Sequence, residues 1–173
     1  VVYVMYSYTN MANPVMEIEN CTFIDNQACG SYGAGAAVKC SGNQVNLTIS
    51  NSTFSNNMAV RNGGAIYAQG NVNISQCVFT GNGANAGNAI YAYGGKVNVS
   101  DSIILESGNA ISIYEISYSD PATVTANDNW FGNNATNYDV EPKTTDVRMD
   151  NWLFLNATAD PSELDIGENS TII

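Results

Sequence analysis

The sequence predicts an all-β fold, a β-solenoid of about five rungs, from its composition, its strand pattern and its internal repeat. Only 12% of the 173 residues are charged, whereas 45% are hydrophobic and 25 are asparagine. Such a chain is poor in strong helix formers and rich in residues that favour strands and turns. Short segments of alternating polarity recur along it, which is typical of strands with one buried face. The composition and the pattern therefore favour β-structure throughout.

Each predicted rung begins with an alternating strand, at 16–20, 47–51, 72–76, 97–101 and 124–128. A Phe-x-x-Asn tetrapeptide follows, beginning at Phe23, Phe54, Phe79 and Phe131, with Ile104 in the slot of the remaining rung. The resulting spacings are 31, 25, 25 and 27 residues. A glycine-rich corner and a second strand come next, at 33–40, 63–69, 87–93 and 108–114. Period-two strands at this spacing, with no helical segment between them, indicate a solenoid.

Stacking explains why the repeat exists. One coil cannot bury its own apolar side, but coils stacked about 4.8 Å apart share a continuous core. Glycines such as Gly64 and Gly87 should permit the sharp corner. We expect one inward stack, formed by Phe23, Phe54, Phe79, Ile104 and Phe131. We also expect a ladder of hydrogen-bonded turn amides, formed by Asn26, Asn57, Asn82 and Asn134.

Two smaller regions flank the predicted solenoid of residues 15–138. Residues 1–14 are interpreted as a strand that caps the first rung or belongs to an upstream one. Residues 139–173 are interpreted as a C-terminal cap, with apolar residues 152–155 beneath the last rung, followed by a linker. Residues 160–173 contain one strand without a predicted partner in this chain. Exposed strand edges recruit other chains, so a homo-polymer formed through terminal strands is one hypothesis.

The pairing of Phe-x-x-Asn with Gly-Gly-Ala-(Ile/Leu/Val) resembles the repeats of chlamydial polymorphic outer membrane proteins. The tail, NDNWFGNN at 127–134 followed by 151–173, is similar to the end of the β-helix in adhesin-like surface proteins of methanogenic archaea. The resemblance implies a right-handed parallel β-helix on an extracellular cell surface, used for attachment. It also implies that the linker leads toward an immunoglobulin-like region, and it carries over no catalytic residue. The fourth repeat departs from this pattern, because IILESG replaces Phe-x-x-Asn there. We therefore expect the corner of that repeat to have a different geometry.

The four cysteines allow three pairings. Cys21 and Cys77 occupy one column two rungs apart, roughly 9.6 Å, which exceeds the roughly 7 Å limit for a bridge. Cys29 and Cys40 flank the glycine-rich corner of one repeat, and a Cys29–Cys40 disulfide is the favoured prediction. The alternative is four buried or weakly reactive thiols.

Eight Asn-x-Ser/Thr sequons are candidate glycosylation sites, beginning at Asn20, Asn46, Asn51, Asn73, Asn98, Asn134, Asn156 and Asn169. Asn73 and Asn98 fall on the outward phase of equivalent strands, where a glycan can be accommodated. A chain this rich in Asn, Ser and Thr also produces sequons by chance, so no particular site is assigned.

Charge and residue content argue against several function classes. The net charge is −11 and the five basic residues are scattered, so no basic stripe exists for nucleic acid. No apolar run is long enough to insert into a membrane. The absence of histidine excludes Ser-His-Asp and Cys-His catalysis. We expect no cofactor and no metal site, since calcium at Asp25, Asp101 or Asp128 lacks a dense acidic run to support it.

An enzyme acting on polysaccharides would need two carboxylates about 5–9.5 Å apart. Asp101 and Asp128, at comparable positions of successive repeats, fit that role best, and Arg61 could neutralise a uronate. Turn hydrogen bonding is the favoured interpretation of both aspartates.

A tyrosine face is the better candidate for binding. If Ile66 and Ile90 point inward, Tyr67 and Tyr91 point outward and stack, with Tyr93 farther along. Tyrosines can hold sugar rings against their apolar faces, although they also favour strands for packing reasons. The leading hypothesis is a non-enzymatic extracellular adhesin module whose partners are cell-surface glycans or surface proteins of another cell. The alternatives are a structural subunit of a head-to-tail filament or cell-wall scaffold, and a polysaccharide-active enzyme.

Overall fold

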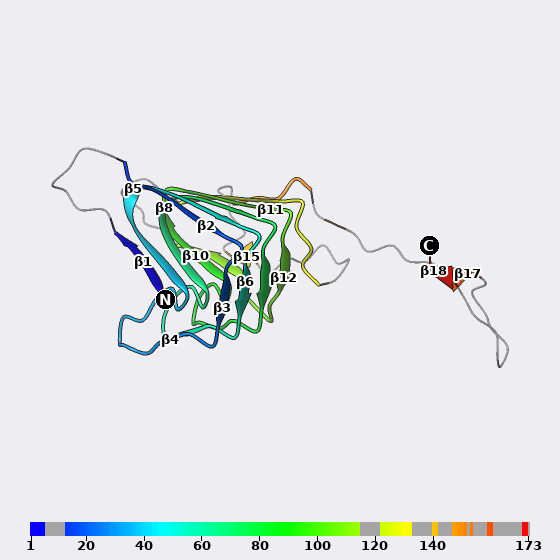
Figure 1. Ribbon diagram of the computed structural model, residues 1–173, viewed down its shortest axis with the longest axis horizontal. Helices are drawn as coiled ribbons and strands as arrows, with labels where there is room; N and C mark the ends of the chain where they lie inside the picture. Colours follow the sequence, from blue (N-terminus) through cyan, green and yellow to red (C-terminus); the bar gives the residue numbers. More distant parts are fainter. Residues whose placement is uncertain are drawn as a thin grey trace.

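The computed structural model describes residues 1–5, 13–114, 122–132, 140–141, 147–151, 153, 159–160 and 171–172. Every regular element within these ranges is a β-strand, and most strands stack in parallel ladders (Figure 1). The predicted all-β parallel solenoid is thereby confirmed.

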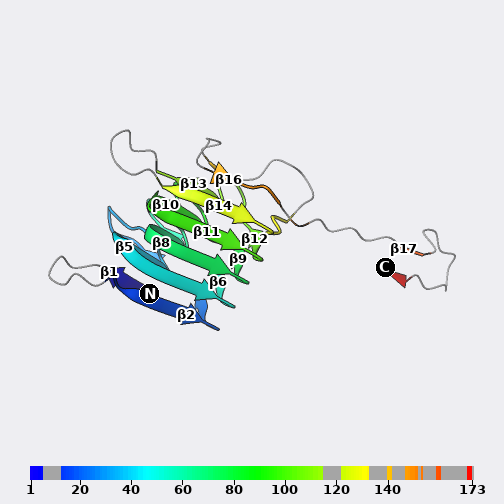
Figure 2. The same ribbon diagram turned by 90° about the horizontal axis from the view of Figure 1, so that it is seen from above.

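The first ladder is built from the alternating segment of each repeat, and its strands lie side by side in Figure 2. Its order is β2 (Val15–Glu19), β5 (Val38–Ser50), β8 (Ile66–Ser75), β11 (Lys96–Ser100), β14 (Thr123–Asn127) and β16 (Val147–Arg148). Ile18 pairs with Ile49, and Ile74 pairs with Val99. Equivalent β-branched residues therefore meet in the core from coil to coil, which is what the repeat predicts.

β5 and β8 are long enough to bend into a second ladder. This ladder contains β1 (Val2–Met5), the first parts of β5 and β8, β10 (Ile90–Gly94), β13 (Ile111–Ile113) and β15 (Val140–Glu141). At the bend of β8, Gly70 has a φ of +147°, and an added Cβ would lie 2.8 Å from the carbonyl oxygen of Gly42. Only glycine fits the bend without displacing the backbone of the neighbouring coil.

The third ladder is formed by the Phe-x-x-Asn segments, β3 (Thr22–Ile24), β6 (Thr53–Ser55), β9 (Val78–Thr80) and β12 (Ile103–Leu105). The rings of Phe23 and Phe54 stack 5.0 Å apart between centroids, and those of Phe54 and Phe79 stack 4.9 Å apart. Ile104 pairs with Phe79, and Phe131 packs against the same core, so the predicted inward stack is present. A further short pair joins β4 (Gln27–Ala28) to β7 (Met58–Ala59).

The turn between the first and third ladders has the same backbone conformation in every described coil. Its residues adopt φ between 48° and 58°, and they are Asn20, Asn51, Gln76, Asp101 and Asp128. Asn and Asp tolerate this left-handed conformation better than most residues. The residue that follows each turn faces inward, and Ser52 Oγ there accepts from the Cys21 N–H and donates to the Ser50 carbonyl. The turn thus satisfies backbone groups within the stack.

The C-terminal region differs from the prediction in one respect. The strand expected to lack a partner is β18 (Thr171–Ile172), and it pairs antiparallel with β17 (Ala159–Asp160). The two strands pair with each other, and this pairing satisfies backbone N–H and C=O groups that were expected to lack a partner. Residues 161–170 and 173, and residues 152 and 154–158 of the predicted cap, lie outside the described residues. The Leu153 N–H donates to the Asn129 carbonyl at 3.0 Å, so part of this region contacts the last coil.

Candidate functional site

A row of tyrosines stands on the outer side of the second ladder. Tyr3 pairs with Lys39, Lys39 with Tyr67, and Tyr67 with Tyr91. The preceding residues Ile66 and Ile90 are fully buried, so strand alternation places both tyrosines outside, as predicted. We call Tyr67, Tyr91, Tyr93 and Tyr114 the tyrosine column.

The rings of the tyrosine column stack on one another. Centroids lie 5.8 Å apart for Tyr67 and Tyr91, 5.6 Å for Tyr67 and Tyr93, and 4.8 Å for Tyr93 and Tyr114. Tyr93 is an additional residue in β10, because Ala92 pairs with Ala68 and Gly94 already pairs with Gln69. This β-bulge inserts a second ring of β10 into the column.

Stacking changes what the column can offer a ligand. The expected sugar-binding surface requires open ring faces, but Tyr91 is only 5% exposed, while Tyr114 is 40% exposed. Because the rings stack on one another, the column offers less open ring face than the prediction assumed. Burial, with neighbouring tyrosines adding to it, raises the pKa of Tyr67 and raises the pKa of Tyr91 to about 12. These two hydroxyls therefore stay protonated to a higher pH than an ordinary tyrosine hydroxyl.

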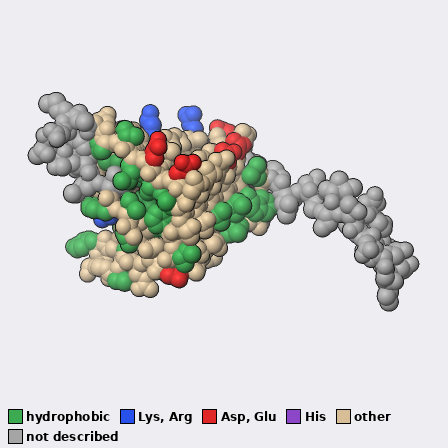
Figure 3. Space-filling model, viewed as in Figure 1, with side chains coloured by type: hydrophobic (Ala, Val, Ile, Leu, Met, Phe, Trp, Pro, Cys, Tyr) green, Lys and Arg blue, Asp and Glu red, His purple; other side chains and the backbone are tan. Residues whose placement is uncertain are grey.

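A cation lies at one end of the column. Lys39 Nζ is 5.7 Å from the ring centroid of Tyr3 and 5.5 Å from that of Tyr67, which are cation–π distances. Arg61, the residue considered for a uronate, has its guanidinium carbon 4.7 Å from the ring centroid of Tyr32. On the face shown in Figure 3, basic side chains are few and acidic side chains gather along the upper edge. Lys39 therefore adds a positive charge to an array of hydroxyl donors.

The predicted asparagine ladder is present over three coils. Asn57 Oδ1 accepts from the backbone N–H of Asn26 at 3.2 Å and from its Nδ2 at 2.8 Å. Asn82 Oδ1 accepts from the same two groups of Asn57, both at 2.9 Å. In the next coil Glu106 takes over, since its two carboxylate oxygens accept from the N–H and Nδ2 of Asn82 at 2.9 and 2.6 Å. Asn134, the remaining predicted member, lies outside the described residues.

Glu106 was not predicted as part of the ladder. Desolvation by burial raises the pKa of its carboxyl to about 7, against the opposing hydrogen bonds from Asn82 and Gly81. Glu106 is thus a titratable group within an otherwise neutral ladder.

The predicted Cys29–Cys40 disulfide is not formed, because all four cysteines are free thiols. Cys40 follows Val38 on the inward phase of β5 and is fully buried, whereas Cys29 is exposed. The Cys40 thiol donates to the Gln69 carbonyl and the Cys29 thiol to Gln27 Oε1. The two side chains therefore have separate environments. Burial also raises the pKa of Cys40 to about 11 and raises that of Cys77.

Five of the eight candidate sequons fall on described residues. Asn20 and Asn51 are exposed at the left-handed turn. Asn73 and Asn98 are exposed on the first ladder, where Asn98 Nδ2 donates to Asn73 Oδ1 at 2.8 Å. Asn46 is half-buried and accepts at its Oδ1 from Asn71. Asn134, Asn156 and Asn169 lie outside the described residues.

The two aspartates considered for catalysis occupy turns. Asp101 and Asp128 have φ of 50° and 58°, at equivalent positions of the left-handed turn. Within the part of the chain that the structure describes, no cluster of three or more His, Cys, Asp or Glu side chains could hold a metal ion. Nor does that part include a helix with the length and hydropathy of a membrane span.

The architecture is that of a parallel β-solenoid repeat protein with an outward aromatic column. Residues 51–69 match the model of the Chlamydia polymorphic membrane protein repeat. The matched segment runs from the turn at Asn51 through β6 and β7 into β8, so it covers most of one coil. The chain therefore carries a β-helix repeat similar to that of polymorphic membrane proteins. No curated protein and no solved structure matches the chain, and the likeness to archaeal adhesin-like proteins stays a prediction.

Proposed function

We propose that this chain is a non-enzymatic module of a cell-surface adhesin, which attaches to glycans or surface proteins of another cell through its tyrosine column. The similarity of residues 51–69 to a repeat of Chlamydia polymorphic membrane proteins supports a surface location. The observation that carries the proposal is the outward column itself, in which four tyrosines from β8, β10 and the residue after β13 contact one another.

The chemistry of the column suits sugars or polar protein surfaces. Protonated phenol groups donate and accept hydrogen bonds, and ring edges provide apolar contact. Lys39, beside Tyr67, supplies one cation that can bind a carboxylate or sulfate group of a ligand. Attachment of this kind needs no moving part, because the strands hold the side chains in a fixed array.

The test is binding of fluorescent beads coated with the protein to an immobilised glycan array and to intact cells. The variant Tyr93→Phe/Tyr114→Phe keeps the ring stack and removes two hydroxyl groups. We expect it to reduce binding about tenfold or more, because two hydrogen bonds of ordinary strength are lost. Thr80→Val, which removes one hydroxyl from β9 on the third ladder, is the matched control and should bind normally. If the tyrosine variant keeps full binding, the column is not the attachment surface.

A further inference from the structure

Lys39 belongs to the same outward row of the second ladder as the tyrosine column. By register the row continues from Lys39 through Tyr67, Tyr91 and Ser112 to Glu141. Glu141 therefore lies four strand spacings from Lys39, about 19 Å between Cα atoms. Surface charges that far apart are largely screened at physiological ionic strength. The part of the column beside Lys39 is thus locally positive.

Lys39 has aromatic rings as its neighbours. Its Nζ lies 5.7 Å from the ring centroid of Tyr3 and 5.5 Å from that of Tyr67. Within the part of the chain that the structure describes, no carboxylate forms an ion pair with this ammonium. Rings attract a cation without neutralising its charge, and an ammonium has three N–H donors. The half-buried Lys39 side chain therefore offers a positive charge to an anion at a restricted place.

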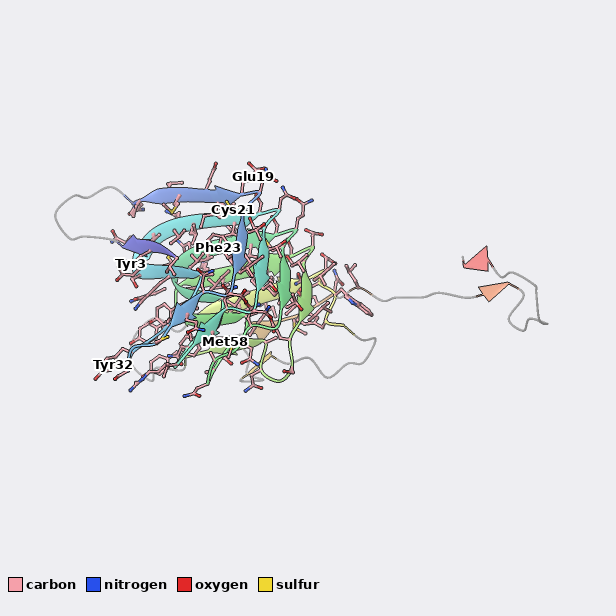
Figure 4. All side chains as sticks on the ribbon, turned by 60° about the horizontal axis from the view of Figure 1, so that its bottom comes forward. Tyr3, Glu19, Cys21, Phe23, Tyr32 and Met58 are labelled. Atoms are coloured by element: carbon pink, nitrogen blue, oxygen red, sulfur yellow. The ribbon has the colours of Figure 1, made fainter. Side chains whose placement is uncertain are left out.

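A second cation lies at the same edge of the column. The guanidinium carbon of Arg61 is 4.7 Å from the ring centroid of Tyr32. The corner that carries Tyr32 continues to Gly35, where an added Cβ would lie 2.9 Å from the Cβ of Tyr67. Figure 4 shows Tyr32 on the same side of the solenoid as Tyr3. Two cations that contact rings therefore border the column.

The overall charge of the protein restricts the kind of anion that can bind there. With a net charge of −11, the molecule as a whole repels a densely charged polyanion. Acidic side chains occupy the other ladders and turns, including Glu17 and Glu19 on β2 and the turn residues Asp101 and Asp128. A single acidic group held next to a cation avoids most of this repulsion. These conditions favour a mostly neutral ligand with isolated acidic groups.

On the basis of the proposed function, we propose that the tyrosine column binds a glycan that carries isolated acidic groups, carboxylate or sulfate, and that Lys39 holds the acidic group. The sugar rings contact the exposed parts of the tyrosines, such as Tyr114, which is 40% exposed. Arg61 contacts a second acidic or polar group of the same glycan chain. A hydrogen bond between an ammonium and an anion is roughly twice as strong as one between neutral groups. Lys39 is therefore the residue that selects an acidic glycan over a neutral one.

The test measures binding of beads coated with the full chain to three matched oligosaccharides. One contains galactose alone, one carries a single galacturonate, and one carries a single galactose 6-sulfate, so the two acidic probes distinguish carboxylate from sulfate. We expect at least one acidic probe to bind about tenfold or more tightly than the neutral probe. Lys39→Met keeps an apolar stem and removes the charge, so it should bind both kinds of probe equally. Lys39→Arg keeps the charge and should keep the preference.

Lys96→Met is the matched control, because Lys96 is an exposed lysine on β11 of the first ladder. It removes the same charge from the molecule and should leave the preference unchanged, and thermal unfolding should show that all variants fold. If acidic and neutral probes bind equally well and Tyr93→Phe/Tyr114→Phe weakens both, the acidic-glycan proposal is wrong and the proposed function stands. Attachment to cells that protease treatment abolishes, without binding to any glycan probe, would overturn the proposal in favour of a protein partner. Absence of binding to glycans and to cells would overturn both.

Discussion

Among the described residues, Glu106 is a carboxyl group whose charge state affects the stability of this solenoid. Its carboxyl has a pKa of about 7 in the folded chain, against an ordinary value of 4.5, because burial disfavours the charged form. The folded chain therefore holds this proton more tightly than the unfolded chain. The stability that Glu106 contributes is fully present below about pH 4.5 and is lost as the pH rises through about 7.

We predict that Glu106→Gln weakens the pH dependence of stability. A glutamine oxygen can accept from Asn82, as Asn57 Oδ1 accepts from Asn26, but it does not titrate. Thermal unfolding of both proteins between pH 5 and pH 8 is the measurement. The wild-type melting temperature should fall relative to that of the variant as the pH rises. Parallel curves for the two proteins would show that Glu106 is not the group responsible.

The cysteines give a second prediction at this scale. Cys29 is exposed, so iodoacetamide should label it in the native protein at pH 8. Cys40 is fully buried and its pKa is about 11 rather than 9.0, which lowers its thiolate fraction about 100-fold. It should label at least that much more slowly. Mass spectrometry after denaturation without reductant should find four labels per chain, and only two would restore the Cys29–Cys40 bridge.

Among the structural elements, the phenylalanine stack depends most on position within the solenoid. Phe79→Ala removes a fully buried ring and should cost about 3–5 kcal/mol of unfolding free energy. Phe23→Ala removes a ring with one neighbour and should cost clearly less. Urea denaturation of both variants measures the difference. Equal losses would mean that the first coil is as well covered as the third.

Features in which the same residue type recurs at the same position of each coil could be predicted from the sequence. Features that depend on the length of one side chain, or on the side of the strand to which it points, were missed. The Ile66–Ile90 pairing and the outward tyrosines followed from two similar octapeptides. The role of Glu106 in the asparagine ladder did not follow from the repeat. Glu106 lies 24 residues after Asn82, one residue fewer than the 25 that separate Asn57 from Asn82. The longer side chain still reaches Asn82. Val38 and Cys40 are two residues apart on one strand, so they point to the same side. This alternation already indicated that Cys40 is buried together with Val38.

At the scale of the whole molecule, the coils are not equally stable. A solenoid coil gains its stability from the coils on either side. β8 and β9 have a described neighbour on both sides, whereas β2 and β3 have one. In the first described coil, Met16 is 37% exposed and Phe23 is only partly buried. Opening should therefore begin at the end coils and proceed toward the middle of the stack.

Hydrogen exchange followed by mass spectrometry can detect this gradient. We predict that the amides of β2 and β3 exchange about tenfold faster or more than those of β8 and β9, because opening the end coil breaks one inter-coil interface while opening a middle coil breaks two. Uniform protection along the stack would contradict the gradient.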